Sequence, residues 1–236
     1  MLVHSPHSAL FAAFSGAGSL VTAYAASNFG QGPVPTQNWC IEMAGIFWGT
    51  TELALLAAYG ASFVYEAIDE TKEKSILAKG KRGLMKAFAL AGQENMDKWS
   101  GAAAWGMLGI GNGFIAASAL TTLMTVGTAG LAPTLLATMY LIYGVSGAAI
   151  NAAKIYGALH RSPKNKIAKF MHDHTEILNV RREEFGALYY LANGCVDPNT
   201  TWWQTAGYLA GQGLTRIGYG FLQRGKLVKA QQQPTP

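Results

Sequence analysis

The residue best placed to do chemistry is Glu52, an acid in the middle of the long apolar segment 40–68. A charged side chain near the centre of a bilayer costs about 3 kcal/mol or more unless it is protonated, paired or hydrated. One interpretation is a proton or cation site, with Tyr59 seven residues further along the same helical stripe. The other is a neutral carboxyl group that hydrogen-bonds to a neighbouring helix, where Asn112 and Asn151 are candidate partners together with Thr121 and Thr122.

Other residue patterns offer less chemistry. His172 and His174 stand two residues apart, so they point in different directions on a helix and lack metal-site spacing. Cys40 and Cys195 form no CxxC pair. The glycines of 109–113 lack the preceding strand, the spacing and the lysine of a nucleotide-binding loop. We therefore expect no enzyme activity, no cofactor and no metal site.

The composition favours a membrane protein. Of the 236 residues, 50% are hydrophobic and only 13% are charged, whereas soluble domains usually carry about 25% charged residues. The net charge of +5 would suit nucleic acid, but the basic residues gather in short clusters beside apolar segments. Membrane topology explains that placement more simply, so we expect no nucleic-acid partner.

Four apolar segments are long enough to span a bilayer, which takes about 20 residues of helix. The first is 8–29, for which a cleaved signal peptide is the alternative, although no positive residue precedes it. The second is 40–68. Residues 99–153 contain no Asp, Glu, Lys or Arg and break at a Gly- and Pro-containing stretch, 126–133, which gives a third and a fourth span. The sequence predicts an all-α, polytopic integral membrane protein with about four transmembrane helices in two hairpins.

Two basic clusters follow the second and fourth spans, and the positive-inside rule places both in the cytoplasm. They are Lys72, Lys74, Lys79, Lys81, Arg82 and Lys86 in the first, and Arg161, Lys164, Lys166 and Lys169 in the second. Acidic residues at 69, 70 and 73 partly balance the first cluster, which favours a solvated helix over a site for lipid headgroups. Both termini then also face the cytoplasm.

These features divide the chain into four regions: a first transmembrane hairpin (1–68), a basic cytoplasmic connection (69–99), a second hairpin (100–160) and a C-terminal cytoplasmic or interfacial region (161–236). The last region is predicted to form an extramembrane helix followed by an amphipathic one, which lies either in the membrane interface or against the protein's own membrane helices. On the amphipathic helix Leu214 and Ile217 fall on the apolar side and Arg216 on the polar side.

Small residues at helical spacing predict close contacts between the spans. The glycines concerned are Gly45, Gly49, Gly109, Gly113, Gly144 and Gly147, and a further pair, Gly207 and Gly211, lies in the terminal region. Each pair alone is a weak signal in a chain with 28 glycines.

We expect a non-enzymatic structural or accessory subunit of a multi-protein membrane complex, such as a secretion or energy-transducing apparatus in a bacterial inner membrane. Its partners would be membrane lipids and other membrane subunits or further copies of itself. Two alternatives remain: an oligomeric channel or proton-coupled carrier that uses Glu52, and a pore-forming protein whose hydrophobic hairpin is 100–153.

Overall fold

The computed structural model describes residues 6–29, 35–68, 75–91, 93–126, 131–160, 165–196, 213–214 and 216–218. Within these ranges the chain forms six long helices and no strand: α1 (Pro6–Phe29), α2 (Pro35–Ala67), α3 (Ile76–Ala91), α4 (Gln93–Val126), α5 (Leu131–Leu159) and α6 (Lys166–Val196). Four of them, α1, α2, α4 and α5, are long and apolar enough to cross a membrane. The prediction of an all-α protein with four spanning helices is confirmed.

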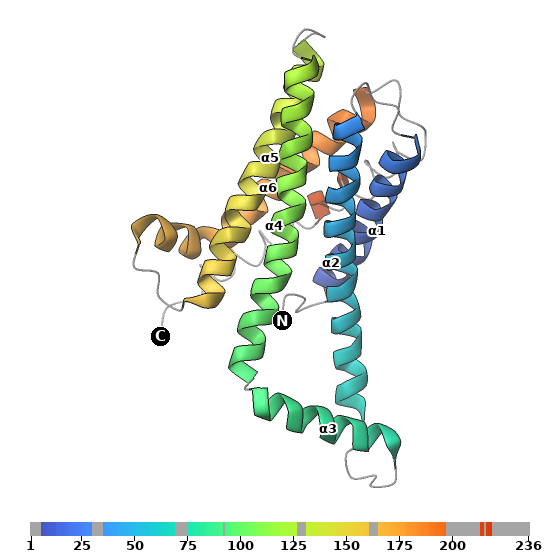
Figure 1. The fold of residues 1–236 in the computed structure, drawn as a ribbon, viewed down its shortest axis with the longest axis vertical. Coiled ribbons are helices and arrows are strands. Elements are labelled where there is room, and N and C mark those ends of the chain that lie inside the picture. The colour runs from blue at the N-terminus through green and yellow to red at the C-terminus, as the bar shows by residue number, and fades with distance from the viewer. Residues whose placement is uncertain are drawn as a thin grey trace.

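The four spans form two antiparallel hairpins that pack side by side. Helix α1 packs along α2, α4 along α5, and α2 against α4. Figure 1 shows the end of α1, the start of α2, the end of α4 and the start of α5 at one end of the bundle. The end of α2, the start of α4 and the end of α5 lie toward the opposite end, where α3 runs across the bundle (Figure 1).

Glycines bring the helices of each hairpin into close contact. A Cβ atom on Gly45 would lie 2.5 Å from the Ser19 carbonyl oxygen, and one on Gly49 would lie 2.6 Å from Leu20 Cγ. In the second hairpin a Cβ on Gly144 would lie 2.6 Å from the backbone nitrogen of Ala116. Separations below 3 Å leave no room for a side chain, so α1 meets α2 and α4 meets α5 through glycine.

Two other glycines of the predicted set, Gly109 and Gly113, are not closely packed. A Cβ on Gly109 would meet only Asn151, at 3.5 Å, and one on Gly113 would meet nothing within 4 Å. Gly113 is exposed on the outer side of α4. These two residues therefore do not limit how closely the described helices approach.

Helix α6 packs against α5, and Figure 1 shows it passing behind the spans. It is not apolar enough to count among the candidate spans, yet its second half joins the core. Tyr189 and Tyr190 are buried there beside Tyr140 and Tyr143 of α5, and the rings of Tyr140 and Tyr189 stack with their centroids 4.5 Å apart. The sequence predicts α6 as an extramembrane helix because charged residues occur along its length, and the structure packs its second half against α5.

Candidate functional site

Four ionisable side chains from three parts of the chain meet in the interior. Glu52 comes from α2, Arg182 and Glu183 from α6, and Arg216 from the short segment 216–218. Their exposed fractions are 5%, 6%, 2% and 1%. A buried charge is costly unless it is paired, and here Glu183 pairs with both arginines while Glu52 lies beside them. We call these four residues the charge cluster.

Glu183 is the centre of the charge cluster. Its Oε1 accepts a hydrogen bond from Arg182 Nη1 at 2.5 Å, and its Oε2 lies 2.8 Å from Arg216 Nε. The Tyr143 hydroxyl of α5 also donates to Oε2, at 3.3 Å. One carboxylate thus joins α6, α5 and the C-terminal segment through charge-assisted bonds, which are stronger than neutral ones.

Arg182 extends the network to α4 and α5. Its Nε donates to the Tyr143 backbone oxygen at 3.2 Å, and its Nη2 donates to Asn112 Oδ1. The Asn112 amide donates in turn to the Leu108 carbonyl at 2.9 Å, which orients its oxygen toward Arg182. The guanidinium carbon also lies 3.8 Å from the centroid of the Tyr143 ring, within cation–π distance.

Gly147 makes room for this arrangement. A Cβ on Gly147 would lie 2.5 Å from Arg182 Nε, Arg182 Nη2 and Asn112 Oδ1. Any larger residue at this position of α5 would therefore displace the guanidinium or the amide. The glycine chosen from the sequence as a helix-contact residue thus borders the charge cluster directly.

Arg216 fastens the C-terminal segment to the same place. Its Nε lies 3.0 Å from the Tyr143 hydroxyl oxygen, and its guanidinium carbon is 5.0 Å from the Tyr190 ring centroid and 5.5 Å from that of Trp48. Burial by itself lowers the pKa of Arg216, but the neighbouring Tyr143 and Glu183 oxygens outweigh it and raise that pKa. Burial raises the pKa of Tyr190, so its phenol stays neutral.

Two described positions of the terminal amphipathic helix differ from the predicted sides. Leu214, expected on the apolar side, is 59% exposed, whereas Arg216, expected on the polar side, is 1% exposed. The reason is the pairing of Arg216 with Glu183, which offsets the cost of burial. The spacing of residues along one helix does not show an ion-pair partner that lies on another helix.

Glu52 lies beside this network without a direct bond to it. Its carboxyl group faces the Ser15 side chain of α1, and the charges of Arg216, Glu183 and Arg182 act on it. Within the described part of the chain, its Oε2 has no hydrogen-bond partner. The second predicted member, Tyr59, is not in the cluster, because its ring packs edge-to-face against Phe63 at 4.9 Å.

The amide and hydroxyl groups proposed as partners of Glu52 have other contacts. Asn112 binds Arg182, and Asn151 is buried next to Gly109. Thr121 and Thr122 each donate at 2.9 Å to the carbonyl four residues earlier in α4. Among the described contacts of these four residues, only that of Asn112 is with a member of the charge cluster.

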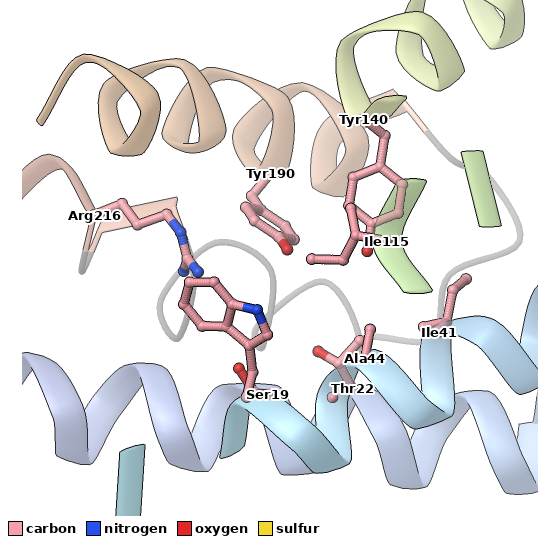
Figure 2. A pocket seen from close by; sticks show the side chains of 10 residues that line it. Ser19, Thr22, Ile41, Ala44, Ile115, Tyr140, Tyr190 and Arg216 are labelled. Atoms are coloured by element: carbon pink, nitrogen blue, oxygen red, sulfur yellow. The ribbon is translucent and has the colours of Figure 1, made fainter. Parts of the chain in front are cut away.

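A small cavity adjoins Arg216 (Figure 2). Its lining includes Ser19 and Thr22 of α1, Trp48 of α2 and Tyr190 of α6. Figure 2 shows Arg216 and Tyr190 reaching into this space from one side and Ser19 from the other. The volume of the cavity is about 20 Å³. This is room for about one water molecule and far less than an organic substrate or cofactor needs.

The side chain of Lys154 on α5 packs against the protein. Its Nζ lies 3.8 Å from the centroid of a Trp105 ring and 3.8 Å from Glu176 Oε1 of α6. Its side chain is only 9% exposed. This contact is an ion pair between α5 and α6.

The structure describes only some residues of the two basic clusters. Lys79, Lys86, Lys166 and Lys169 are exposed and Arg82 is half-buried. Lys81 is 9% exposed; it donates to the Ile68 carbonyl at 3.1 Å and lies 4.7 Å over the Tyr65 ring. Lys72, Lys74, Arg161 and Lys164 lie outside the described residues, as do Gly207 and Gly211.

The described cysteine and histidine side chains do not form a metal site. Cys40 is a buried free thiol, and the His174 ring contacts the Phe170 carbonyl of its own helix at 2.8 Å. Among the residues that the structure places, no three His, Cys, Asp or Glu side chains gather as metal ligands would.

Sequence reasoning did not find Arg182, Glu183, Arg216 or Tyr143. The run Arg-Arg-Glu-Glu at 181–184 resembles a solvated helix face, and its outer members, Arg181 and Glu184, do form an ion pair at 3.1 Å that is more exposed. The sequence did contain a sign that Arg182 faces a neighbouring helix. Gly186 and Tyr190 lie four and eight residues after Arg182, so a small and an aromatic residue follow it near the same side of the helix. A Cβ on Gly186 would lie 2.4 Å from the Tyr143 ring, so this side packs closely against α5.

Comparison of the chain with protein-family models, curated proteins and solved structures finds no match to any of the three.

Proposed function

We propose that this protein is a non-enzymatic, membrane-embedded structural or accessory subunit of a multi-protein membrane complex. The observation that carries the proposal is the charge cluster, in which Glu183 pairs with both arginines within the protein itself. Its bonds join α6 and residue 216 to α4 and α5. An arrangement of this kind supports a fixed scaffold more than a path for ions.

The chemistry of the cluster favours a fixed role. Arginine stays protonated at all physiological pH values, so Arg182 and Arg216 do not exchange protons. Their guanidinium groups occupy the space beside Glu183 that a transported cation would need. A satisfied buried network of this kind favours one arrangement of the helices, because each alternative leaves a charge unpaired.

The outer faces of the spans offer contact surface to lipids and to other membrane proteins. On α1 a stripe of exposed apolar side chains includes Leu10, Phe14, Val21 and Tyr24. On α5 a similar stripe includes Leu135, Ile142 and Val145. Both follow helical spacing and extend along the candidate spans. Within the proposal, one of these faces binds a neighbouring subunit and the other contacts lipid.

Site-specific photo-crosslinking in the native membrane tests the subunit assignment. A photoreactive phenylalanine analogue replaces Phe14 or Ile142, whose side chains are 59% and 53% exposed, and Tyr140, 9% exposed, is the matched control. The proposal expects a discrete adduct with another protein from Phe14 or Ile142 and none from Tyr140. Adducts with lipid alone, together with a monomer after mild detergent extraction, would refute it; adducts between copies of this chain alone would replace it with a homo-oligomer.

The compartment and topology belong to the same proposal: a bacterial inner membrane, with the basic connections and both termini in the cytoplasm. Reporter fusions after Gly80 and Lys164 are expected on the cytoplasmic side, and fusions after Pro33 and Gly130 on the other side. Opposite locations for Gly80 and Lys164 would overturn this topology.

One observation favours a second candidate, a proton-coupled carrier. Glu52 is buried in a candidate span, and one of its oxygens has no hydrogen-bond partner within the described residues. For a carrier, Glu52→Gln abolishes a proton flux in liposomes while the protein still assembles, and Glu42→Gln, on a half-buried acid of the same helix, leaves the flux intact. The subunit proposal expects no flux above that of empty liposomes for any of the three proteins.

A further inference from the structure

Helix α3 joins two candidate spans and lies across their shared end. The span on α2 ends at Ala67 and the span on α4 begins at Lys98. When both spans cross a bilayer, the helix between them lies close to one membrane surface. Figure 1 shows α3 running crosswise to α2 and α4 there, instead of continuing either of them.

One side of α3 is anchored to the protein. Ala78 and Lys81 are its buried residues in the described part, with 0% and 9% exposure. Lys81 donates to the Ile68 carbonyl at 3.1 Å and lies over the Tyr65 ring. Apart from this contact with α2, α3 packs only weakly against α4. Most of the other described side chains of α3 are exposed.

A second side of α3 exposes large apolar side chains. Ile76 is 85% exposed, Leu77 64% and Leu84 50%. Leu77 and Leu84 are seven residues apart, so they lie on nearly the same line along the helix. Exposed apolar groups arranged in this way mark a surface that contacts a membrane or a partner.

The third side is basic. Lys79, Arg82 and Lys86 follow the spacing i, i+3, i+7 and lie on the side of the helix opposite Leu77 and Leu84. Lys79 and Lys86 are exposed. Residues 76–91 contain four basic residues and no acidic one, because the acids of this region lie in the flanking stretches 69–73 and 94–97. The pattern of an apolar face and a basic face is typical of helices that lie in the membrane interface.

We propose that α3 is an interfacial helix that binds anionic phospholipid headgroups through Lys79 and Lys86 while Leu77 and Leu84 enter the acyl region. The positive charge of the helix selects an anionic surface over a zwitterionic one. Snorkelling explains how one helix serves both layers, because lysine side chains reach the headgroups from a helix whose apolar face lies deeper. This reverses the expectation of a solvated helix with mixed charges.

The first test measures depth on the full chain in vesicles of phosphatidylcholine with phosphatidylglycerol. Both native cysteines are replaced by alanine, and an environment-sensitive fluorophore is attached to Leu84→Cys or, on the opposite side of α3, to Lys86→Cys. The label at 84 is expected to be quenched by nitroxides on the acyl chains, and the label at 86 by a water-soluble quencher. Equal quenching of both labels by the water-soluble quencher would refute an interfacial α3. The face with Leu77 and Leu84 would then be a binding surface for a soluble protein.

The second test measures lipid selectivity with the label at position 84. Brominated phosphatidylglycerol is expected to quench it more than brominated phosphatidylcholine, and Lys79→Gln/Lys86→Gln to reduce that preference by about fivefold per lysine at low salt. The matched control is Lys166→Gln/Lys169→Gln, which removes the same charge from exposed positions of α6 and is expected to keep the preference. An equal loss in both double variants would overturn the assignment to α3. No partner protein takes part, so the result is independent of the subunit proposal.

Discussion

Replacing Glu183 by glutamine removes one negative charge from the centre of the charge cluster and keeps its shape. In the native protein this carboxylate contacts Arg182 at 2.5 Å, Arg216 at 2.8 Å and the Tyr143 hydroxyl at 3.3 Å. In the variant, two buried guanidinium groups face Glu52 as their remaining acid within the cluster. The interior then holds an uncompensated positive charge.

The magnitude follows from that imbalance. Removing one partner of a buried ion pair costs about 3–5 kcal/mol, mostly because the other charge is left unpaired. The double variant Glu183→Leu/Arg216→Met removes one charge of each sign, and Arg182 keeps its hydrogen bonds to Asn112 and to the Tyr143 carbonyl. Its cost is expected to stay below that of Glu183→Gln, because one guanidinium group instead of two is left without Glu183. The effects of the two single changes are therefore strongly non-additive.

The assay is reversible unfolding in mixed micelles with increasing SDS, followed by tryptophan fluorescence. Trp48 is a suitable reporter, since its ring centroid lies 5.5 Å from the Arg216 guanidinium carbon. Glu184→Gln is the matched control on the neighbouring residue. Its ion pair with Arg181 is partly exposed, with side-chain exposures of 26% and 62%, so the expected loss is below about 1 kcal/mol.

Two outcomes would refute this reasoning. If Glu183→Gln costs no more than Glu184→Gln, the cluster does not hold the bundle together. If the double variant costs as much as the sum of its single changes, the balance of charge is not the reason for its stability.

Two further predictions follow from the same site. Gly147→Ala places a methyl group 2.5 Å from the Arg182 guanidinium and is expected to lower the free energy of unfolding by about 1–3 kcal/mol. The control is Gly106→Ala, whose methyl group meets nothing within 4 Å and leaves the free energy of unfolding unchanged or raises it slightly. Similar losses in both variants would contradict the steric explanation. Because burial raises the pKa of Tyr190, the unfolded state releases its phenolic proton first, so stability is fully present below about pH 10 and falls as the pH rises beyond it. Tyr190→Phe is expected to reduce that fall in unfolding titrations between neutral and alkaline pH, and an unchanged pH profile would exclude Tyr190 as a source of it.

The sequence by itself determined the membrane architecture. Long apolar segments interrupted by Gly- and Pro-containing stretches specify spanning helices, because an unpaired backbone group cannot remain in hydrocarbon and a helix pairs them all within one segment. The apolar segments 8–29 and 40–68, and the charge-free stretch 99–153 with its break at 126–133, therefore predict two hairpins. The burial of Glu52 is also visible in the sequence, as an acid surrounded by apolar residues.

Only the tertiary structure decided what surrounds Glu52. Arg182 is predicted to be solvated because its neighbours in the chain are charged, and Arg216 because it lies on the polar side of the amphipathic pattern. Both predictions measure hydrophobicity along one helix alone. Each arginine becomes buried through partners far away in sequence, such as Asn112, Tyr143 and Trp48. The cost of burying a charge depends on groups that face it across helices. The charge cluster is therefore a property of the packing, whereas the spans that enclose it are a property of the sequence.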